Sequence, residues 1–258
     1  MLAVVEIGNS NIVFAVFEGE SLKGQWRMRS ELDRTGDEYA LLLDGFLCGA
    51  AFDPSAINAC ALASVVQPLT PSLAHAVQAT LNMVPLILES HSDFGIVNRC
   101  DPPASVGIDR LLNASAAFAQ YVGPSIVVDL GTATTFDVVS STGEFLGGSI
   151  APGLRTAADA LTAAAPRLGR IEAGLSKRAI GTNTAEALQS GVFLGYALMV
   201  DGMIARIRTE LGTPAQTIVT GGQWQTLWDL CDSLDHAEPH LILNGIRLAY
   251  ERSVKSSA

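Results

Sequence analysis

The sequence predicts an α/β protein built from two similar units, each a mixed β-sheet flanked by helices. The stretch EIGNSNIVFAVFEG at residues 6–19 returns from residue 129 as DLGTATTFDVVSSTGEFL, at a constant offset of 123 residues. Each half also alternates strand-like and helix-like runs after a three-strand start, which is typical of a mixed sheet covered by helices. With 258 residues and 48% hydrophobic composition, the chain can form two packed cores, and we expect domains at 1–113 and 114–258.

The first half begins with three short strands. LAVVEIG, NIVFAVFEG and LKGQWRMR are runs rich in β-branched residues that Gly and polar turns separate. DEYALLLDGFLCGA then has helical spacing, AINACALASVV reads as a buried strand, and TPSLAHAVQATLN is a second helix. In that helix we expect Thr70 as the cap and Pro71 in the first turn. VPLILES follows as a strand, and SVGIDRLLNASAAFAQY is a helix that opens after Gly107.

The second half repeats this order. SIVVDLG, ATTFDVVS and FLGGSIAPG are its first three strands. Ala-rich helices are expected over residues 154–165 and 184–211, followed by a strand at TIVTGG and a terminal helix at LILNGIRLAYERS. Two such units facing each other would leave a ligand cleft between them.

The net charge and the cysteine spacing exclude several classes of function. A formal net charge of −10 argues against a nucleic-acid or membrane partner, because such surfaces require clustered Lys and Arg. The four cysteines show no CxxC spacing, so we expect buried reduced thiols rather than disulfides or metal ligands. The start MLAVVEIG lacks a basic region and meets Glu6, which is unlike a signal peptide or a membrane span. We therefore expect a cytoplasmic protein.

An acid followed by Gly and small polar residues stands at the same place in both halves. Glu6 aligns with Asp129, and the next residues align in register: Gly8 with Gly131, Asn9 with Thr132, and Asn11 with Thr134. Such turns offer backbone N–H groups to phosphates, and the acid can hold a cation that balances their charge. A plain hairpin turn explains one copy, whereas two copies favour phosphate binding. VTGG at 219–222 adds a surface that adenosine or phosphate could approach, with a simple bend as the alternative.

Nine blocks, in order, resemble the signature blocks of the type III pantothenate kinase family, which belongs to the acetate and sugar kinase, Hsp70 and actin superfamily. They are EIGNSNIVFAVFEG, RTGDEYALLL, SVVQPLTPSL, DPPASVGIDRLLNASAA, VVDLGTATTFDVV, EFLGGSIAPGL, IGTNTAEALQSGVFLGY, TIVTGG and PHLILNGIRLAYER. The match runs from residue 1 to about 252. It implies duplicated actin-like (ribonuclease H-like) domains and ATP-dependent phosphorylation of pantothenate to 4′-phosphopantothenate, the first step of coenzyme A biosynthesis. It also implies a homodimer with pantothenate bound close to the subunit interface.

The resemblance assigns roles that the residues alone leave open. Asp109, which by position could cap a helix, would accept the proton of the pantothenate hydroxyl. Asp129 would bind a monovalent cation, K⁺ or NH₄⁺, and Glu6 would lie where Mg²⁺ meets the phosphates. Thr184 reads as an N-cap by itself and would recognise substrate by resemblance. The implied substrate-binding set is Cys100, Gly107, Ile108, Asp109, Arg110 and Thr184; the implied ATP-binding set is Glu6, Ile7, Gly8, Asn9, Ser10, Asn11, Ile12, Val13, Thr132, Gly221 and Gly222.

Two residues depart from the family's pattern. The first block normally carries Asp where this chain has Glu6, and an aromatic residue normally stands at the position of Cys100. Two alternatives therefore stay open. One is a catalytically weak homologue that acts as a ligand sensor or regulatory partner, and the other is a kinase for another small alcohol.

Overall fold

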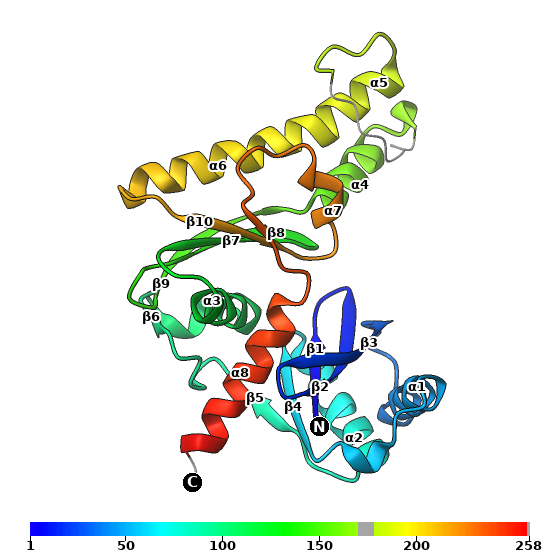
Figure 1. Cartoon of the computed structure of the whole chain (residues 1–258). Helices are drawn as coiled ribbons and strands as arrows, with labels where there is room; N and C mark the ends of the chain where they lie inside the picture. The colour runs from blue at the N-terminus through cyan, green and yellow to red at the C-terminus, as the bar shows by residue number, and fades with distance from the viewer. Residues whose placement is uncertain (170–177, 257–258) are drawn as a thin grey trace. The chain divides into compact units, whose positions relative to one another are not determined.

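A computed structural model of the chain describes residues 1–169 and 178–256 (Figure 1). The chain divides into two compact units: unit 1 contains Met1–Ala116 together with the segment from His240 to the C-terminus, and unit 2 contains Ala117–Pro239. The second domain expected from the sequence, 114–258, differs from unit 2 because it includes the C-terminal segment. The difference is the C-terminal helix, whose packing is described below.

Unit 1 is built on a five-stranded mixed sheet in the order β3-β2-β1-β4-β5. Its strands are β1 (Leu2–Ile7), β2 (Asn11–Glu18), β3 (Ser21–Arg29), β4 (Ala59–Ser64) and β5 (Leu86–Leu88). β2 pairs antiparallel with both β1 and β3, whereas β4 pairs parallel with both β1 and β5. Residues 12–17 of β2 are all buried, because the central part of the sheet is covered on both faces.

Two helices of unit 1, α1 (Gly36–Gly49) and α2 (Thr70–Leu81), pack against each other and against one face of the sheet. Thr35 and Glu38 form a reciprocal capping box at the start of α1. The expected Thr70 cap of α2 is wrong. The chain enters α2 from a 3₁₀ turn at Gln67–Leu69, so Leu69 takes the N-cap position and Thr70 is already helical. Pro71 lies in the first turn, as expected.

The C-terminal helix α8 (Leu241–Ser256) packs on β1, β4 and β5. Its buried side chains include Leu241, Leu243 and Ile246. These contacts place α8 in unit 1 although it follows unit 2 in sequence, because the apolar face of the helix needs a sheet to cover. The short strand β6 (Val97–Asn98) and the helix α3 (Ile108–Gln120) complete the stretch before unit 2.

The five strands of unit 2 follow the same order, β9-β8-β7-β10-β11, with the same parallel and antiparallel pairings as β3-β2-β1-β4-β5. They are β7 (Ser125–Leu130), β8 (Ala133–Val139), β9 (Glu144–Pro152), β10 (Gln216–Thr220) and β11 (His236–Ala237). The offset of 123 residues carries β1 onto β7 and β3 onto β9 residue for residue. The predicted duplication of an α/β fold with mixed sheets is therefore confirmed.

The helices of unit 2 are α4 (Leu154–Ala164), α5 (Thr184–Gln189), α6 (Gly195–Leu211) and α7 (Trp224–Trp228). The helix expected over 184–211 is one continuous run in which a π-helical turn, Ser190–Leu194, joins α5 to α6. By length and composition this run could cross a membrane. However, Phe193, Tyr196 and Ile204 belong to the packed core of unit 2, so we interpret it as a core helix.

All four cysteines are free thiols, as expected. Cys60 and Cys231 are buried, and burial raises the pKa of each thiol to about 12, so both stay protonated and unreactive. The expectation of burial is wrong for Cys48, which is exposed.

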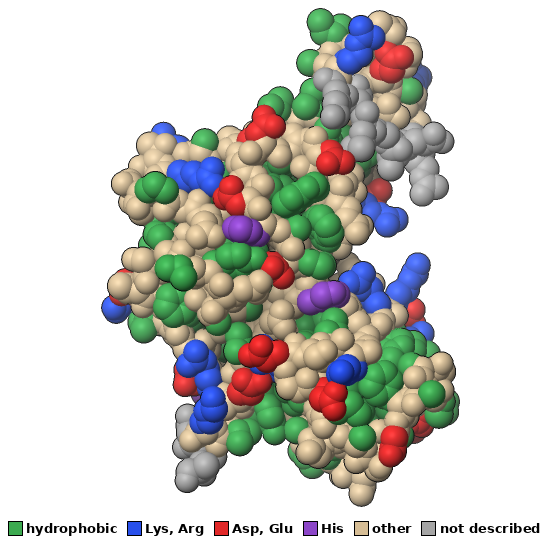
Figure 2. Space-filling model, in the orientation of Figure 1, with side chains coloured by type: hydrophobic (Ala, Val, Ile, Leu, Met, Phe, Trp, Pro, Cys, Tyr) green, Lys and Arg blue, Asp and Glu red, His purple; other side chains and the backbone are tan. Residues whose placement is uncertain are grey.

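On the face of the molecule in Figure 2, Lys and Arg side chains lie in small groups among Asp and Glu. This face offers no continuous basic surface of the kind that binds nucleic acid.

Candidate active site

The first turn, Gly8–Ser10, joins β1 to β2 in unit 1. Its Gly8 N–H donates to Asn11 O at 3.0 Å, which closes the turn. Ser30, directly after β3, supports it from the side. The Ser30 hydroxyl donates to Gly8 O at 2.5 Å, and the Ser30 N–H donates to Ser10 O at 3.2 Å. The side chains of Asn9 and Ser10 are exposed, and the turn is held by hydrogen bonds to its backbone carbonyl groups.

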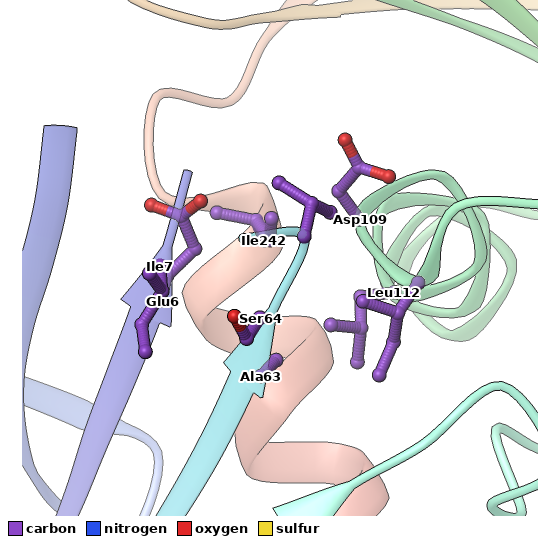
Figure 3. A pocket seen from close by; sticks show the side chains of 9 residues that line it. Glu6, Ile7, Ala63, Ser64, Asp109, Leu112 and Ile242 are labelled. Atoms are coloured by element: carbon purple, nitrogen blue, oxygen red, sulfur yellow. The ribbon is translucent and has the colours of Figure 1, made fainter. Parts of the chain in front are cut away.

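A small pocket of unit 1 lies where β1 and β4 end and α3 begins (Figure 3). Figure 3 shows the carboxylates of Glu6 and Asp109 on opposite sides of it, with Ile242 of α8 between them in this view. The lining residues are Glu6, Ile7, Ala63, Ser64, Val65, Ile108, Asp109, Leu112 and Ile242. Because β1 and β4 are parallel, the residues at their carboxyl ends meet at one edge of the sheet. The first turn of α3 lines the same pocket, so two acids that are distant in sequence, Glu6 and Asp109, share it.

Asp109 lies half-buried in the first turn of α3. Its Oδ1 accepts the Arg110 N–H at 2.9 Å and lies 2.4 Å from the position that a Cβ on Gly107 would take. The glycine therefore gives the carboxylate room to lie over the backbone. Burial raises the pKa of the Asp109 carboxyl, and the hydrogen bond and charge of Arg110 oppose this only in part. A carboxylate with a raised pKa is a better proton acceptor once ionised, which suits a general base.

The segment before α3 is closed by its own hydrogen bonds. Asn98 Oδ1 accepts the Cys100 N–H at 3.0 Å, and Asn98 Nδ2 donates to Pro103 O at 2.9 Å. The Asp101–Pro102 peptide bond is cis. Cys100 is half-buried and is not among the residues that line the pocket of Glu6 and Asp109.

The second turn, Gly131–Thr132, joins β7 to β8 in unit 2. Its Gly131 N–H donates to Ala133 O at 3.0 Å, as Gly8 does to Asn11 in the first turn. Asp129 Oδ1 lies 2.4 Å from the position that a Cβ on Gly221 would take. Gly221 also has φ +89°, so a side chain here would be strained and would meet the acid. Glycine at 221 therefore lets the end of β10 approach Asp129 closely.

Gln223, which no motif indicated, holds the second turn in place. Its N–H donates to Leu130 O at 3.1 Å, and its Nε2 donates to Gly131 O at 3.2 Å. Its Oε1 accepts the Arg155 N–H at 3.2 Å. The Gln223 side chain thus links the turn to α4, and its backbone N–H links it to the end of β7. Only the tertiary arrangement brings these groups together, so no local signal could have identified Gln223.

Thr184 is exposed at the first position of α5. The N-cap reading for Thr184 is wrong, because Asn183 occupies the cap and its side chain accepts the Glu186 N–H at 3.0 Å. Glu186 in return accepts the Thr182 N–H and the Asn183 side-chain amide. With the capping done by its neighbour, the Thr184 hydroxyl is not required for helix initiation.

The side chains of the site that could bind a cation are carboxylates, and these suit cations that prefer oxygen ligands. Among residues 1–169 and 178–256, no group of three or more His, Cys, Asp or Glu side chains could hold a metal ion. A cation here would be bound by one or two carboxylates together with phosphate oxygens, which is how Mg²⁺ is held in many kinases. Glu6 and Asp129 each stand beside a turn and fit this arrangement.

The structure groups most of the expected site residues within their own units. In unit 1 it brings Glu6, the first turn and Asp109 to one end of the sheet. In unit 2 it brings Asp129, the second turn and the TGG glycines together. Cys100 and Thr184 are not among the residues of either group. Ser64 and Ile242 were missed, since one is a plain strand-end serine and the other lies on a helix far along the chain.

The chain is similar to members of one protein family over nearly its whole length. The family model described as type III pantothenate kinase matches residues 2–206. A type III pantothenate kinase of Thermomicrobium roseum is 43% identical over 256 residues, which cover 99% of both chains. One from Roseiflexus castenholzii is 41% identical over 251 residues, covering 97% of this chain and 98% of the relative.

Solved structures share the fold at low sequence identity. A Campylobacter jejuni protein described as a conserved putative Baf family transcriptional activator superposes with a TM-score of 0.63 at 22% identity, covering 98% of this chain and 99% of that one. The activator of 2-hydroxyisocaproyl-CoA dehydratase from Clostridium difficile, solved with bound ADPNP, superposes with a TM-score of 0.58 at 11% identity, covering 99% and 96%. A ROK hexokinase from Thermus thermophilus gives 0.51 at 14% identity, covering 99% of each chain. These likenesses show a fold of two actin-like halves.

Proposed function

The chain belongs to the type III pantothenate kinase family, and from this we propose which of its residues perform the reaction. The protein is a transferase that uses ATP to phosphorylate pantothenate to 4′-phosphopantothenate, the first step of coenzyme A biosynthesis. The observation that carries our assignment of roles is the shared pocket of Glu6 and Asp109. It sets an acid with a raised pKa beside the first phosphate turn.

Asp109 is the general base. Its carboxylate accepts the proton of the 4′-hydroxyl while the hydroxyl oxygen forms a bond to the γ-phosphorus. The bond between this phosphorus and the β–γ bridging oxygen breaks, and ADP leaves with the electron pair. Phosphoryl transfer depends mainly on alignment and charge stabilisation, so a single positioned acid is enough on the protein side. Burial raises the pKa of the Asp109 carboxyl, which increases its proton affinity as a base.

The family resemblance assigns ATP-binding residues to each turn: Glu6 to Val13 at the first turn, and Thr132, Gly221 and Gly222 at the second. Glu6 would hold Mg²⁺, which supplies charge neutralisation to the phosphate oxygens when bound. Asp129 would hold a monovalent cation, K⁺ or NH₄⁺, beside the second turn. In support, each carboxylate lies beside the glycine of its own turn, Glu6 beside Gly8 and Asp129 beside Gly131.

Pantothenate lies against the segment around Gly107–Arg110, with Cys100 and Thr184 as further recognition residues.

We also propose that the protein is a cytoplasmic homodimer. The helical run 184–208 is a candidate contact, and Leu198 on it is 61% exposed, which suits burial by a second subunit. Light scattering after gel filtration tests this, because a monomer mass at micromolar concentration would contradict it.

A coupled assay of ADP release, with and without pantothenate and K⁺, tests the function. We expect ADP release to require pantothenate and to rise with K⁺. The same assay is then repeated with a panel of small alcohols, each replacing pantothenate as the phosphoryl acceptor. Release with another alcohol but not with pantothenate would make this chain a kinase for that alcohol. Pantothenate binding without turnover would indicate a ligand sensor.

A further inference from the structure

Both turns are tied to the residue that follows the third strand of their unit. In unit 1 the Ser30 N–H, one residue past β3, donates to Ser10 O at 3.2 Å. In unit 2 the Gly153 N–H, one residue past β9, donates to Thr132 O at 3.0 Å. Ser30 and Gly153 are related by the same offset of 123 residues as the two acids. The backbone tie is therefore part of the duplicated architecture.

In each unit a side-chain hydroxyl group donates a second hydrogen bond to a carbonyl of the turn. The residue that supplies the hydroxyl stands at a different position in the two units. Ser30 Oγ donates to Gly8 O at 2.5 Å. Gly153 has no room for a side chain, since a Cβ would lie 2.3 Å from Gly131 O and 2.6 Å from Thr132 O. Thr156, in the first turn of α4, supplies the hydroxyl instead and donates to Thr132 O at 2.7 Å. Two unrelated positions thus provide the same kind of contact.

These bonds fix how the turn presents its amides. A trans peptide carries its C=O and the following N–H on opposite sides. Holding Gly8 O toward Ser30 therefore turns the Asn9 N–H away from Ser30, where a phosphate oxygen can accept it. Without the hydroxyl the peptide plane between Gly8 and Asn9 loses this hydrogen bond and rotates more freely. A shift of about 1 Å in a positioning group is enough to lower a rate ~10²-fold.

We propose that Ser30 and Thr156 are positioning residues for ATP, whose hydroxyl groups hold the two phosphate turns in the nucleotide-binding conformation. This inference rests on the proposed function, because it takes the turns as the place where ATP binds. Neither residue touches the nucleotide. Each acts through a turn carbonyl, Ser30 through Gly8 and Thr156 through Thr132.

The test is steady-state kinetics of Ser30→Ala and Thr156→Val. Thr156 is exposed and Val keeps its branched shape, so this variant folds even if Ser30→Ala does not. We expect the KM for ATP to rise about 5- to 10-fold in each, the usual effect of one lost hydrogen bond. The KM for pantothenate should stay within about 2-fold. Ser30→Thr keeps a hydroxyl and should restore most of the ATP affinity.

Matched controls separate positioning from a general loss of structure. Thr162 lies in the same helix as Thr156, and its hydroxyl donates only to Ala158 O, so Thr162→Val should leave the KM for ATP unchanged. Ser55→Ala is the control for Ser30, since the Ser55 hydroxyl donates only to Asp53 on the surface. A purely structural role would lower the melting temperature and weaken both substrates alike. That pattern would contradict the proposal.

Two further variants distinguish failure of this inference from failure of the proposed site. Asn9→Ala and Thr132→Ala change the turns themselves. If they weaken ATP binding while Ser30→Ala and Thr156→Val do not, the positioning role is wrong and the turns remain the ATP site. If all four variants bind ATP as the wild type does, ATP does not bind at the turns, and the placement under the proposed function is wrong.

Discussion

Asp109 combines a position at the mouth of α3 with a carboxyl pKa that burial has raised. Asp109→Asn should therefore cut turnover by roughly 10²-fold or more, the scale of a lost general base, while ATP binding stays nearly intact. Asp101→Asn, an exposed acid in the preceding segment, is the matched control and should keep its activity. Near-wild-type turnover in folded Asp109→Asn would remove Asp109 from the mechanism.

The same substitution has a pH-dependent effect on stability. Because the folded-state pKa of Asp109 is raised, the folded protein binds this proton more tightly than the unfolded chain does. The stabilisation is present below the unfolded pKa and is lost as pH rises through the folded pKa. The amide side chain of Asp109→Asn carries no charge, so the variant should melt at an equal or higher temperature than the wild type at pH 8. A lower melting temperature at pH 8 would contradict this.

Asp129 stands beside Gly131 and Gly221, where a cation would balance phosphate charge. Asp129→Ala should abolish stimulation by K⁺ and weaken ATP binding, because that balance is lost. A titration of turnover against KCl at constant ionic strength measures both effects. Asp232→Ala, an exposed acid of the same unit, controls for net charge. Undiminished K⁺ activation in Asp129→Ala would assign the cation to another site.

Glu6 has the charge of Asp but one more methylene, so its carboxylate reaches roughly 1 Å further into a site where ~1 Å matters. Its Oε1 lies 2.8 Å from the position that a Cβ on Gly8 would take, so the carboxylate occupies the space that the glycine leaves open. We predict that Glu6→Asp raises the turnover number with little change in stability. A magnesium titration of both forms decides the matter. An unchanged or lower rate at every concentration would mean that the loop is fitted to Glu6.

At the scale of an element, the start of α5 links capping to substrate recognition. Asn183 caps the helix, and Thr184 is its first residue. Asn183→Ala should cost about 1 kcal/mol of local helix stability and loosen Thr184. We expect a higher KM for pantothenate with kcat changed less. Thr35→Ala removes the cap of α1 and is the control, since it should lower the melting temperature alone. An unchanged KM in Asn183→Ala would separate α5 from substrate binding.

At the scale of the whole molecule, α8 closes unit 1 from the far end of the chain. Ile246 is fully buried on the face that packs against β1, β4 and β5. Ile246→Ala should lower the free energy of unfolding by about 2 to 5 kcal/mol, as for other buried Ile-to-Ala changes. Val254→Ala, on the same helix and 48% exposed, should cost far less. Equal effects in a denaturant titration would mean that α8 does not stabilise unit 1.

The sequence alone determined the duplicated α/β architecture, most of the strands and the acids of both turns. These features are local: β-branched runs, Gly-rich turns and an acid at the strand end are written in neighbouring residues and then repeated after 123 positions. By position alone Asp109 could equally cap a helix, and its role as a base came from the resemblance of GIDR to the family motif; the structure places it in a pocket with Glu6.

Only the tertiary structure decided which distant residues support these local features. Leu69 rather than Thr70 takes the N-cap position of α2, because the preceding 3₁₀ turn sets the entry of the chain. Ile242 reaches the pocket only because the apolar face of α8 needs a sheet to cover. Ser30 and Thr156 contact the turns across about 20 residues of chain or more, and hydrogen bonds over such separations follow from packing rather than from local pattern.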